Sequence, residues 1–242
     1  MARAVGINVG ANTTLPGFRA PIYPDGSFEF IPIPETAETT VEPPTYGDLG
    51  IDLPASAPPD IHSTPVYLDP AFASVPCASG YTYGDPWGVK ASPILALEEG
   101  DYLFFYATLD RREGPDPYPE PWLTPGWGAY LIGHFRLARD PISEAAYREG
   151  PPTVREPFAD NAHVKRDPFD AAVLVEGDDT SRLYGTAAPL SGGGGTEANH
   201  VVTEWSGDSG RGPWWRRPLE FDESGTAALL EYVSRGDYEP VG

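Results

Sequence analysis

The strongest constraint on the fold is a pair of apolar runs of strand length, Tyr102–Ala107 and Ala129–Leu137. A strand that is apolar on both sides must be covered on both faces, so the first run predicts a strand at the centre of the core. Gly100 and Asp101 form a turn just before it. Because a single loop joins the two runs, we expect them to lie side by side as antiparallel strands.

Proline and glycine are frequent, with 29 and 27 residues in a chain of 242. This composition suits many short strands joined by long loops and does not suit a helical bundle. The sequence therefore predicts an α+β fold with a mixed or barrel-like β-sheet, a few short helices and long loops rich in proline and glycine. We expect one domain over residues 1–242, in which residues 191–242 form a C-terminal extension packed on the rest.

Local patterns predict further elements around the two core strands. Strands are expected at residues 4–10 and 171–175, a hairpin turn at Asp25–Gly26, and helices at residues 141–148 and 224–234. Residues 181–188 have the pattern of a short helix or turn. Residues 34–65, rich in proline and threonine, are too long for a simple connection, so we expect them to lie on the body of the protein as a candidate part of a site.

Acidic residues dominate the charge: 36 Asp and Glu stand against 16 Lys and Arg, which gives a formal net charge of −20. Lys90 and Lys165 are the only lysines in the sequence. This composition is typical of proteins from salt-loving (halophilic) microbes, in which acidity keeps a protein solvated. High salt screens charge repulsion to a few ångströms, so the composition neither supports nor excludes a nucleic-acid ligand.

The sequence lacks the patterns of several familiar sites. Cys77 is the single cysteine, which excludes an internal disulfide and a cysteine-based zinc site. There is no phosphate-binding glycine loop with a lysine, and the histidines are scattered, so we expect neither a metal nor another cofactor. Residues 1–6 lack the apolar core of a signal peptide and no run reaches the length of a membrane span, which predicts a cytoplasmic protein without a membrane partner.

A first group of candidate binding residues brackets the first core strand: Asp85, Trp87, Lys90 and Tyr106. The turn residues at 84–88 predict a loop that contains the first two. The two aromatic rings offer flat apolar faces, while the carboxylate and the amine offer an acceptor and a donor. Stacking combined with polar groups at the ring edge is how proteins hold a planar heterocycle such as a base. The alternative is structural, with a loop aromatic that covers the core and a salt bridge on the surface.

A second group lies in the segment Asn161-Ala-His163-Val-Lys165-Arg166. In an extended segment His163 and Lys165 point the same way, with Asn161 beside them. Amide, imidazole and ammonium groups together can bind an anion such as phosphate, or serve as acid and base. The alternative is an exposed edge strand, where lysine is common. Because lysine is so rare in this chain, its use at residue 165 favours the functional interpretation.

Several stretches of the chain together resemble one protein family. They are Gly6–Gly10, Pro21–Glu35, Tyr83–Lys90, Gly100–Ala107, Tyr130–Phe135, Asn161-Ala-His163 with Arg166, and Ser181–Leu183. The most specific is the DGSFEFIPIPE block at residues 25–35. On these residues the chain resembles the nucleotide-modification-associated domain family of the third type, from the first strand to about Ser191. Members of that family are encoded beside enzymes that make modified DNA bases, which implies modified DNA or a nucleotide as partner, together with other proteins of a DNA-modification system.

The centre of the chain is also similar to the EVE, YTH and ASCH domains, whose PUA-like β-barrels hold a flipped or modified base in a pocket. Gly100–Asp101, Tyr106 and Gly133 carry this similarity. Those domains often have Ser or His after the tyrosine, whereas Ala107 and Thr108 stand here. The resemblance implies a barrel-like sheet with a base-binding pocket, but the polar group that follows the tyrosine has no counterpart.

Three hypotheses of function follow. The protein binds a modified nucleotide or DNA base as a reader, it is an enzyme that makes, alters or removes such a base, or it is a scaffold subunit of a modification complex. Convergence of the ionisable residues Asp25, Glu29, Asp69, His163 and Lys165 would favour the enzyme, with His163, Lys165 and Asp69 as catalytic groups. The decisive observation is whether residues 83–90 and 161–166 face one pocket.

Overall fold

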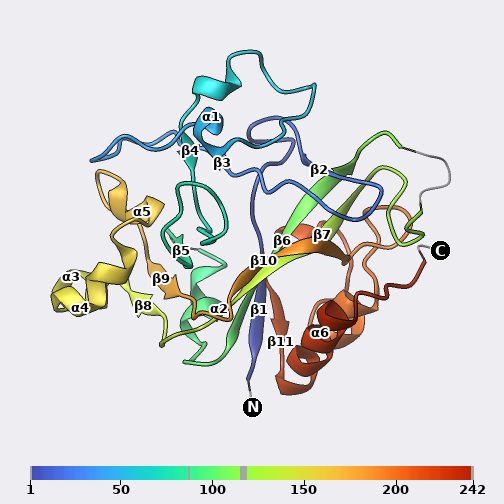
Figure 1. Ribbon diagram of the computed structural model, residues 1–242. Helices are drawn as coiled ribbons and strands as arrows, with labels where there is room; N and C mark the ends of the chain where they lie inside the picture. Colours follow the sequence, from blue (N-terminus) through green and yellow to red (C-terminus); the bar gives the residue numbers. More distant parts are fainter. Residues whose placement is uncertain (1, 87, 115–118, 241–242) are drawn as a thin grey trace.

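The computed structural model describes residues 2–86, 88–114 and 119–240 (Figure 1). At its centre is a mixed sheet in which the described strands follow the order β10-β7-β6-β1-β11, with β2 paired to β6. These strands are β1 (Ala4–Asn8), β2 (Ala20–Ile22), β6 (Tyr102–Arg111), β7 (Trp127–Arg136), β10 (Arg182–Pro189) and β11 (Leu219–Phe221). β1 and β2 run parallel to β6, and the other pairs are antiparallel.

β6 and β7 form the core, as the two apolar runs predict. They pair in antiparallel register from Tyr102 opposite Arg136 to Asp110 opposite Trp127. Neighbouring elements cover both faces, so seven consecutive residues of β6 and eight of β7 are buried. Phe105 packs its ring edge-on against the rings of Phe72 and Phe135. The position of β6 between β7 and β1 confirms that the first run is a central strand.

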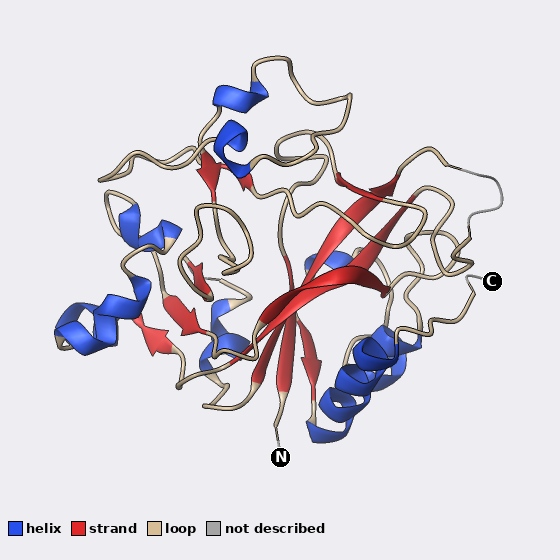
Figure 2. Ribbon diagram, in the orientation of Figure 1, coloured by secondary structure: helices blue, strands red, loops and turns tan. Residues whose placement is uncertain are grey.

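Two smaller sheets lie beside the central one. β5 (Thr82–Asp85), β9 (Val173–Glu176) and β8 (Ile142–Ser143) form an antiparallel sheet in the order β5-β9-β8, and β3 (Ile33–Pro34) pairs with β4 (Val66–Tyr67). The α-helices are α1 (Tyr46–Leu49), α2 (Ala91–Leu95), α3 (Glu144–Glu149), α4 (Pro152–Arg155), α5 (Ala162–Lys165) and α6 (Glu223–Arg235). The remaining short helices are η1 (Ile61–Ser63), η2 (Glu156–Phe158), η3 (Val201–Trp205) and η4 (Trp214–Arg216). Figure 1 and Figure 2 show α6 to the right of the central strands and α3 and α4 at the left edge of the view.

The predicted α+β fold with a mixed sheet and short helices is confirmed. The barrel-like alternative is not, because β10 and β11 stand at opposite ends of the strand order and the described strands do not close into a barrel. β11 nevertheless comes from the predicted C-terminal extension and extends the central sheet beside β1. The extension thus supplies part of the sheet itself.

The predicted helices and turns agree with the structure where a cap residue marks them. Ser143 caps α3 by accepting a hydrogen bond from the backbone N–H of Ala146 at 3.2 Å. Gly236 ends α6 in the left-handed conformation, at φ 68°. Gly26 also has a positive φ, and two backbone hydrogen bonds close the predicted hairpin turn, from Tyr23 N–H to the carbonyl of Ser27 and from Gly26 N–H to the carbonyl of Tyr23.

Two local predictions are wrong. Of residues 181–188, expected as a helix or turn, all except Ser181 lie in β10, which pairs with β7. The register shifts between Leu183 and Ala188, so the strand lacks a regular alternation that the sequence would reveal. Gly84 and Asp85, expected in a loop, belong to β5, where they pair with Leu174 and Val173.

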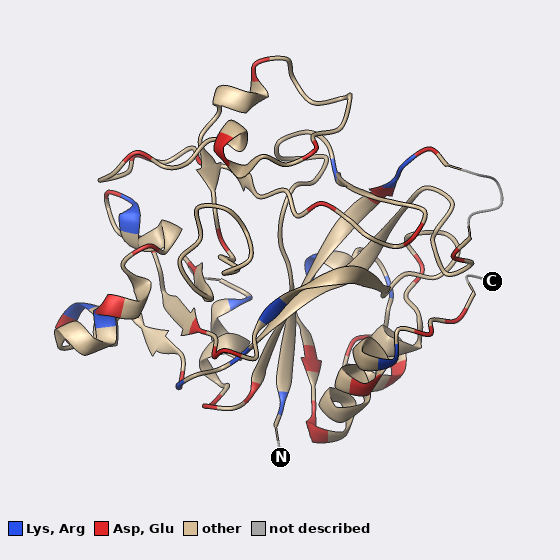
Figure 3. Cartoon of the chain, in the orientation of Figure 1, with Lys and Arg blue, Asp and Glu red and all other residues tan. Residues whose placement is uncertain are grey.

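The segment of residues 34–65 lies along α5 and so borders the site described below. The backbone N–H of Thr40 donates to the carbonyl of Lys165 at 2.7 Å, and that of Asp167 donates to the carbonyl of Glu38 at 2.9 Å. Acidic residues are spread over loops on several sides of the fold and over α6 (Figure 3). None of the described helices is both long enough and apolar enough to cross a membrane.

Candidate active site

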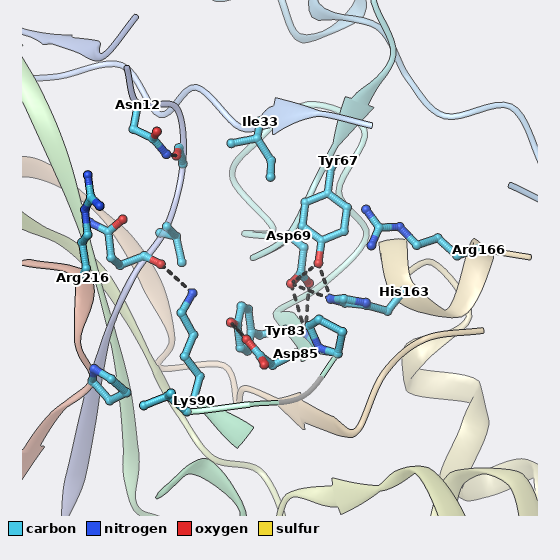
Figure 4. A pocket seen from close by; sticks show the side chains of 17 residues that line it. Asn12, Ile33, Tyr67, Asp69, Tyr83, Asp85, Lys90, His163, Arg166 and Arg216 are labelled. Atoms are coloured by element: carbon cyan, nitrogen blue, oxygen red, sulfur yellow. Dashed lines mark hydrogen bonds and ion pairs between the residues drawn. The ribbon is translucent and has the colours of Figure 1, made fainter. Parts of the chain in front are cut away.

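A cavity of about 540 Å³ opens where the end of β1, strand β5, the start of α2 and helix α5 meet (Figure 4). Its aromatic, polar and charged lining residues are Asn8, Asn12, Tyr67, Asp69, Tyr83, Asp85, Lys90, His163, Arg166 and Arg216. Residues 83–90 contribute Tyr83, Gly84, Asp85, Pro86, Val89 and Lys90 to the lining, and residues 161–166 contribute His163 and Arg166. Residues 83–90 and 161–166 therefore face one pocket.

Helix α5 replaces the predicted extended segment. Asn161 is its N-cap, and the side-chain Oδ1 accepts a hydrogen bond from the backbone N–H of His163 at 3.0 Å. Asparagine is among the best N-cap residues, so it turns the chain into a helix here. As a result His163 is buried at the cavity, whereas Lys165 points elsewhere and pairs with Asp160 at 3.1 Å. The two side chains therefore do not meet at the cavity.

Asp69 is a fully enclosed acid of the cavity, with its side chain 0% exposed. Its oxygens accept hydrogen bonds from the backbone N–H of Gly84 at 3.1 Å and from Asn161 Nδ2 at 2.9 Å. Burial raises the pKa of Asp69 to about 7, although the charge of His163 and the bonds from Gly84 and Asn161 act to lower it. Asp69 can therefore gain or lose a proton near neutral pH.

Three side chains form a hydrogen-bonded series that ends at the cavity, which we call the Tyr67–His163–Asp170 chain. The Tyr67 hydroxyl bonds His163 Nε2, and His163 Nδ1 lies 2.5 Å from Asp170 Oδ1. Figure 4 shows Tyr67, Asp69 and His163 gathered on one side of the cavity, with Tyr67 Oη 3.3 Å from Asp69 Oδ2. A phenol, an imidazole and two carboxylates thus meet within hydrogen-bond reach, which is the arrangement that proton transfer needs.

The environment sets the protonation of the two ends of this chain. Burial and the nearby charge of Asp69 raise the pKa of Tyr67 well above its ordinary value, so the phenol keeps its proton at neutral pH. Burial also acts to raise the pKa of Asp170, but the hydrogen bonds and charges of His163 and Arg166 outweigh it and lower that pKa. An ionised Asp170 only accepts hydrogen bonds, so His163 Nδ1 carries a hydrogen and donates it to Asp170.

Arg166 contacts two members of the Tyr67–His163–Asp170 chain and so fixes their positions. Its guanidinium carbon lies 4.3 Å from the centre of the Tyr67 ring, and its Nη1 is 2.9 Å from Asp170 Oδ2. The other edge of the guanidinium donates two bonds to Glu35, at 2.9 and 3.0 Å. These carboxylates accept from Nε, Nη1 and Nη2, so Arg166 positions Tyr67 and Asp170 while it also lines the cavity, and its role in binding substrate stays a prediction.

Gly84 permits the close approach of His163 to β5. A Cβ atom at residue 84 would lie 2.5 Å from His163 Cδ2 and 3.2 Å from Asn161 Oδ1, both of them buried. No other residue type fits without moving the imidazole, since such a contact is far inside van der Waals distance. The glycine in β5 is therefore required by the site rather than by a turn.

Lys90 and Asp85 lie on the remaining walls of the cavity. Lys90 Nζ donates to the carbonyl of Asn8 at 3.0 Å, and burial lowers the pKa of Lys90, although the charges of Asp85 and Asp69 act to raise it. Asp85 is buried and accepts a hydrogen bond from the Tyr83 hydroxyl at 2.9 Å. The predicted group of Asp85 and Lys90 thus reaches the same cavity as His163 and Asp69.

Comparison with known proteins places the chain in a family. A family model described as nucleotide modification associated domain 3 matches residues 3–231, which includes every residue of the cavity. The chain belongs to this family. No curated protein and no solved structure matches the chain. The match confirms the family resemblance and extends it beyond Ser191, whereas nothing here supports the similarity to PUA-like barrels.

Some predicted residues of this nucleotide modification associated domain lie away from the cavity. Tyr106 is buried in β6 and its hydroxyl donates to the backbone carbonyl of Arg217 at 2.6 Å. Asp25 is exposed in its turn, where it accepts bonds from Ser27. Trp87 falls outside the described residues. Of the predicted cluster of ionisable residues, only Asp69 and His163 come together, with 3.8 Å between Asp69 Oδ2 and His163 Nε2.

Tyr67, Asp170 and Glu35 were not among the site residues predicted from the sequence. A local signal existed for Asp170, which follows Arg166 by four residues and pairs with it across the end of α5. Tyr67 and Glu35 come from β4 and from the residue after β3, far away in the sequence. In the part of the chain that the structure describes, no three His, Cys, Asp or Glu residues are grouped so as to hold a metal ion.

Because the pKa of Asp69 is raised, we predict that the free energy of unfolding of the domain depends on pH. The folded protein binds this proton more tightly than the unfolded chain, so the free energy of unfolding falls as pH rises from about 4, near the ordinary pKa of 3.8, through about 7. Asp69→Asn removes this dependence. We expect the stability of the variant relative to wild type to improve by about 2–4 kcal/mol between pH 5 and pH 8 in urea unfolding.

A matched control comes from the exposed Asp25. Hydrogen bonds from Ser27 lower the pKa of that carboxyl, so Asp25→Asn should change relative stability slightly and in the opposite direction over the acid range. A difference between Asp69→Asn and wild type that stays constant from pH 5 to pH 8 would show that Asp69 is ionised throughout.

Proposed function

We propose that the cavity binds a nucleotide or a base of modified DNA, and that the Tyr67–His163–Asp170 chain acts on it by acid–base chemistry. The family supplies the context, a domain associated with nucleotide modification. The observation that carries the proposal is the bond between the Tyr67 hydroxyl and His163 Nε2, with Asp170 on the opposite ring nitrogen. Such a series orients a proton carrier toward whatever lies in the cavity.

The roles of the three residues follow from their protonation. Asp170 accepts the Nδ1 hydrogen of His163, which leaves Nε2 to accept the hydroxyl hydrogen of Tyr67. When a substrate group gives a proton to the Tyr67 oxygen, the hydroxyl proton of Tyr67 passes to His163. Asp170 then stabilises the imidazolium. In the reverse direction the imidazolium returns a proton through Tyr67 to a leaving group.

The size and lining of the cavity support a nucleotide as ligand. A volume of about 540 Å³ falls within the range of about 300–1,000 Å³ that is usual for small-molecule sites. Tyr67 and Tyr83 supply aromatic surface, and Asp69 and Asp85 supply acceptors for the exocyclic amines of a base. On the opposite side Lys90 and Arg216 supply positive charge in a chain whose net charge is −20.

The test is mass spectrometry of nucleosides. DNA that carries modified bases, and the matching free nucleotides, are incubated with the wild type and with His163→Ala, then digested and analysed. We expect the wild type to change at least one nucleoside and the variant to leave it unchanged, with the fold of the variant verified by circular dichroism. A wild type that binds a modified base tightly but changes none is a reader, and one that neither binds nor changes any is a scaffold; both results contradict the proposed chemistry.

A further inference from the structure

A smaller cavity of about 250 Å³ adjoins the first one. Asn8, Asn12 and Arg216 line both cavities, so the two spaces meet at these residues. Arg19 and Trp215 lie on the far wall of the smaller cavity, which we call the side cavity. The side cavity is therefore reached from the main one past Arg216, on the side opposite to Tyr67 and His163 (Figure 4).

Arg216 brings an uncompensated positive charge to the junction. It is exposed at the end of η4, and its guanidinium has no hydrogen bond or ion pair with any of the described residues. The next residue, Arg217, is held instead by two bonds of 2.7 Å to Asp208. An arginine that is left without a carboxylate in so acidic a chain is available to an anionic ligand.

Arg19 brings a second guanidinium, and packing fixes its place. It lies over the ring of Trp127, at 4.3 Å from the centre, and that ring packs edge-on against Trp215. Asp110 contacts only its Nη1, at 3.2 Å, and is half exposed. The Nε of Arg19 is buried without an acceptor. Asp110 thus offsets part of the charge of Arg19 and leaves other donors unpaired.

Asn8 adds a third unpaired donor where the cavities meet. Its side-chain Nδ2 is buried and has no hydrogen-bond partner within the described residues. A buried donor without an acceptor costs about 1–3 kcal/mol, and an oxyanion with several acceptor oxygens offsets that cost. Two guanidinium groups and an amide around a small space are the chemistry by which proteins recognise a phosphoryl group.

We propose that the side cavity binds the phosphoryl group of the ligand whose base occupies the main cavity. The inference rests on the proposed function, and it makes the ligand a nucleotide rather than a free base or nucleoside. Asp69 and Asp85 repel a phosphate from the opposite wall of the main cavity, whereas Arg216 and Arg19 attract it. The ligand is thereby oriented, with its base toward Tyr67 and His163.

The experiment compares the four common deoxynucleosides with their 5′-monophosphates in calorimetric titrations at one fixed salt concentration, since phosphate binding depends strongly on salt. We expect the wild type to bind at least one monophosphate ten-fold or more tightly than its nucleoside. Arg216→Ala should bring the two affinities most of the way to equality. Arg211→Ala, which alters another exposed arginine of the same loop outside both cavities, should keep the wild-type ratio.

The remaining measurements separate this proposal from the proposed function. Pyrophosphate has no base, and its binding should also depend on Arg216. In Tyr67→Phe the monophosphate should still bind more tightly than the nucleoside, by the same ratio as in the wild type. A short oligonucleotide without terminal phosphates identifies the source: dependence on Arg216 there indicates a DNA phosphodiester, and its absence indicates a free nucleotide. Equal affinity for nucleoside and monophosphate, or unchanged affinity in Arg216→Ala, would overturn the phosphate site even if the wild type alters a base. If the wild type alters no base but still binds the monophosphate more tightly than the nucleoside, only the proposed function is overturned.

Discussion

Tyr67→Phe is expected to lower turnover by about 10²–10⁴-fold, the usual contribution of a general acid or base. The change removes one oxygen and breaks the path from the cavity to His163, while the ring stays beneath Arg166. Binding of the nucleotide should change little, because the apolar face of the ring remains. The rate is measured by nucleoside mass spectrometry at saturating substrate, and the affinity by titration.

Tyr46→Phe is the matched control. Its hydroxyl is also buried and donates one hydrogen bond, to the carbonyl of Pro32 at 2.8 Å, but it does not line the cavity. Both variants should lose a similar free energy of unfolding, about 1 kcal/mol for one hydrogen bond. Only Tyr67→Phe should lose turnover. Full activity in Tyr67→Phe would mean that His163 acts without it.

Arg166→Met is expected to reduce the free energy of unfolding by about 3–5 kcal/mol, because it leaves a buried charge without its partner. The side chain of Glu35 is only 3% exposed, and it accepts two hydrogen bonds from the guanidinium of Arg166. Asp170 loses the same guanidinium. Urea unfolding of wild type and variant measures the difference.

Two further variants test the cause. Arg235→Met removes an exposed pair with Glu231 on α6 and should cost less than about 1 kcal/mol. Adding Glu35→Gln to Arg166→Met should restore part of the lost stability, since it removes the unpaired charge. If the double variant is no more stable than the single one, the loss comes from the packing of Arg166 on Tyr67 and not from Glu35.

The core of the fold was predictable because burial on both faces leaves a continuous apolar run in the sequence. β6 and β7 follow from such runs, and α6 follows from its helical propensity and from Gly236. β10 was not predictable, because its register shift against β7 breaks the alternation of side chains. α5 depends on a single cap, Asn161, and so has no periodicity to detect.

The site was predictable in its segments but not in its contacts. The sequence pointed to Lys90, Asp85 and His163 by their chemistry, and these residues do line one cavity. Tyr67 and Glu35 could not be found that way, because they are far from His163 and Arg166 in the sequence and come close to them only in the folded chain. For the same reason the direction in which Tyr106 points, into the core, is set by the pairing of β6 and not by any local pattern.

The most direct test of the central claim is a crystal structure of Tyr67→Phe bound to a nucleotide that the wild type alters. The variant should hold the ligand intact, because its chemistry is blocked. We predict the ring in the main cavity within hydrogen-bond reach of residue 67 or His163, and the phosphate beside Arg216. A ligand bound elsewhere on the domain, with the main cavity empty and His163 in contact with nothing but protein, would contradict the account.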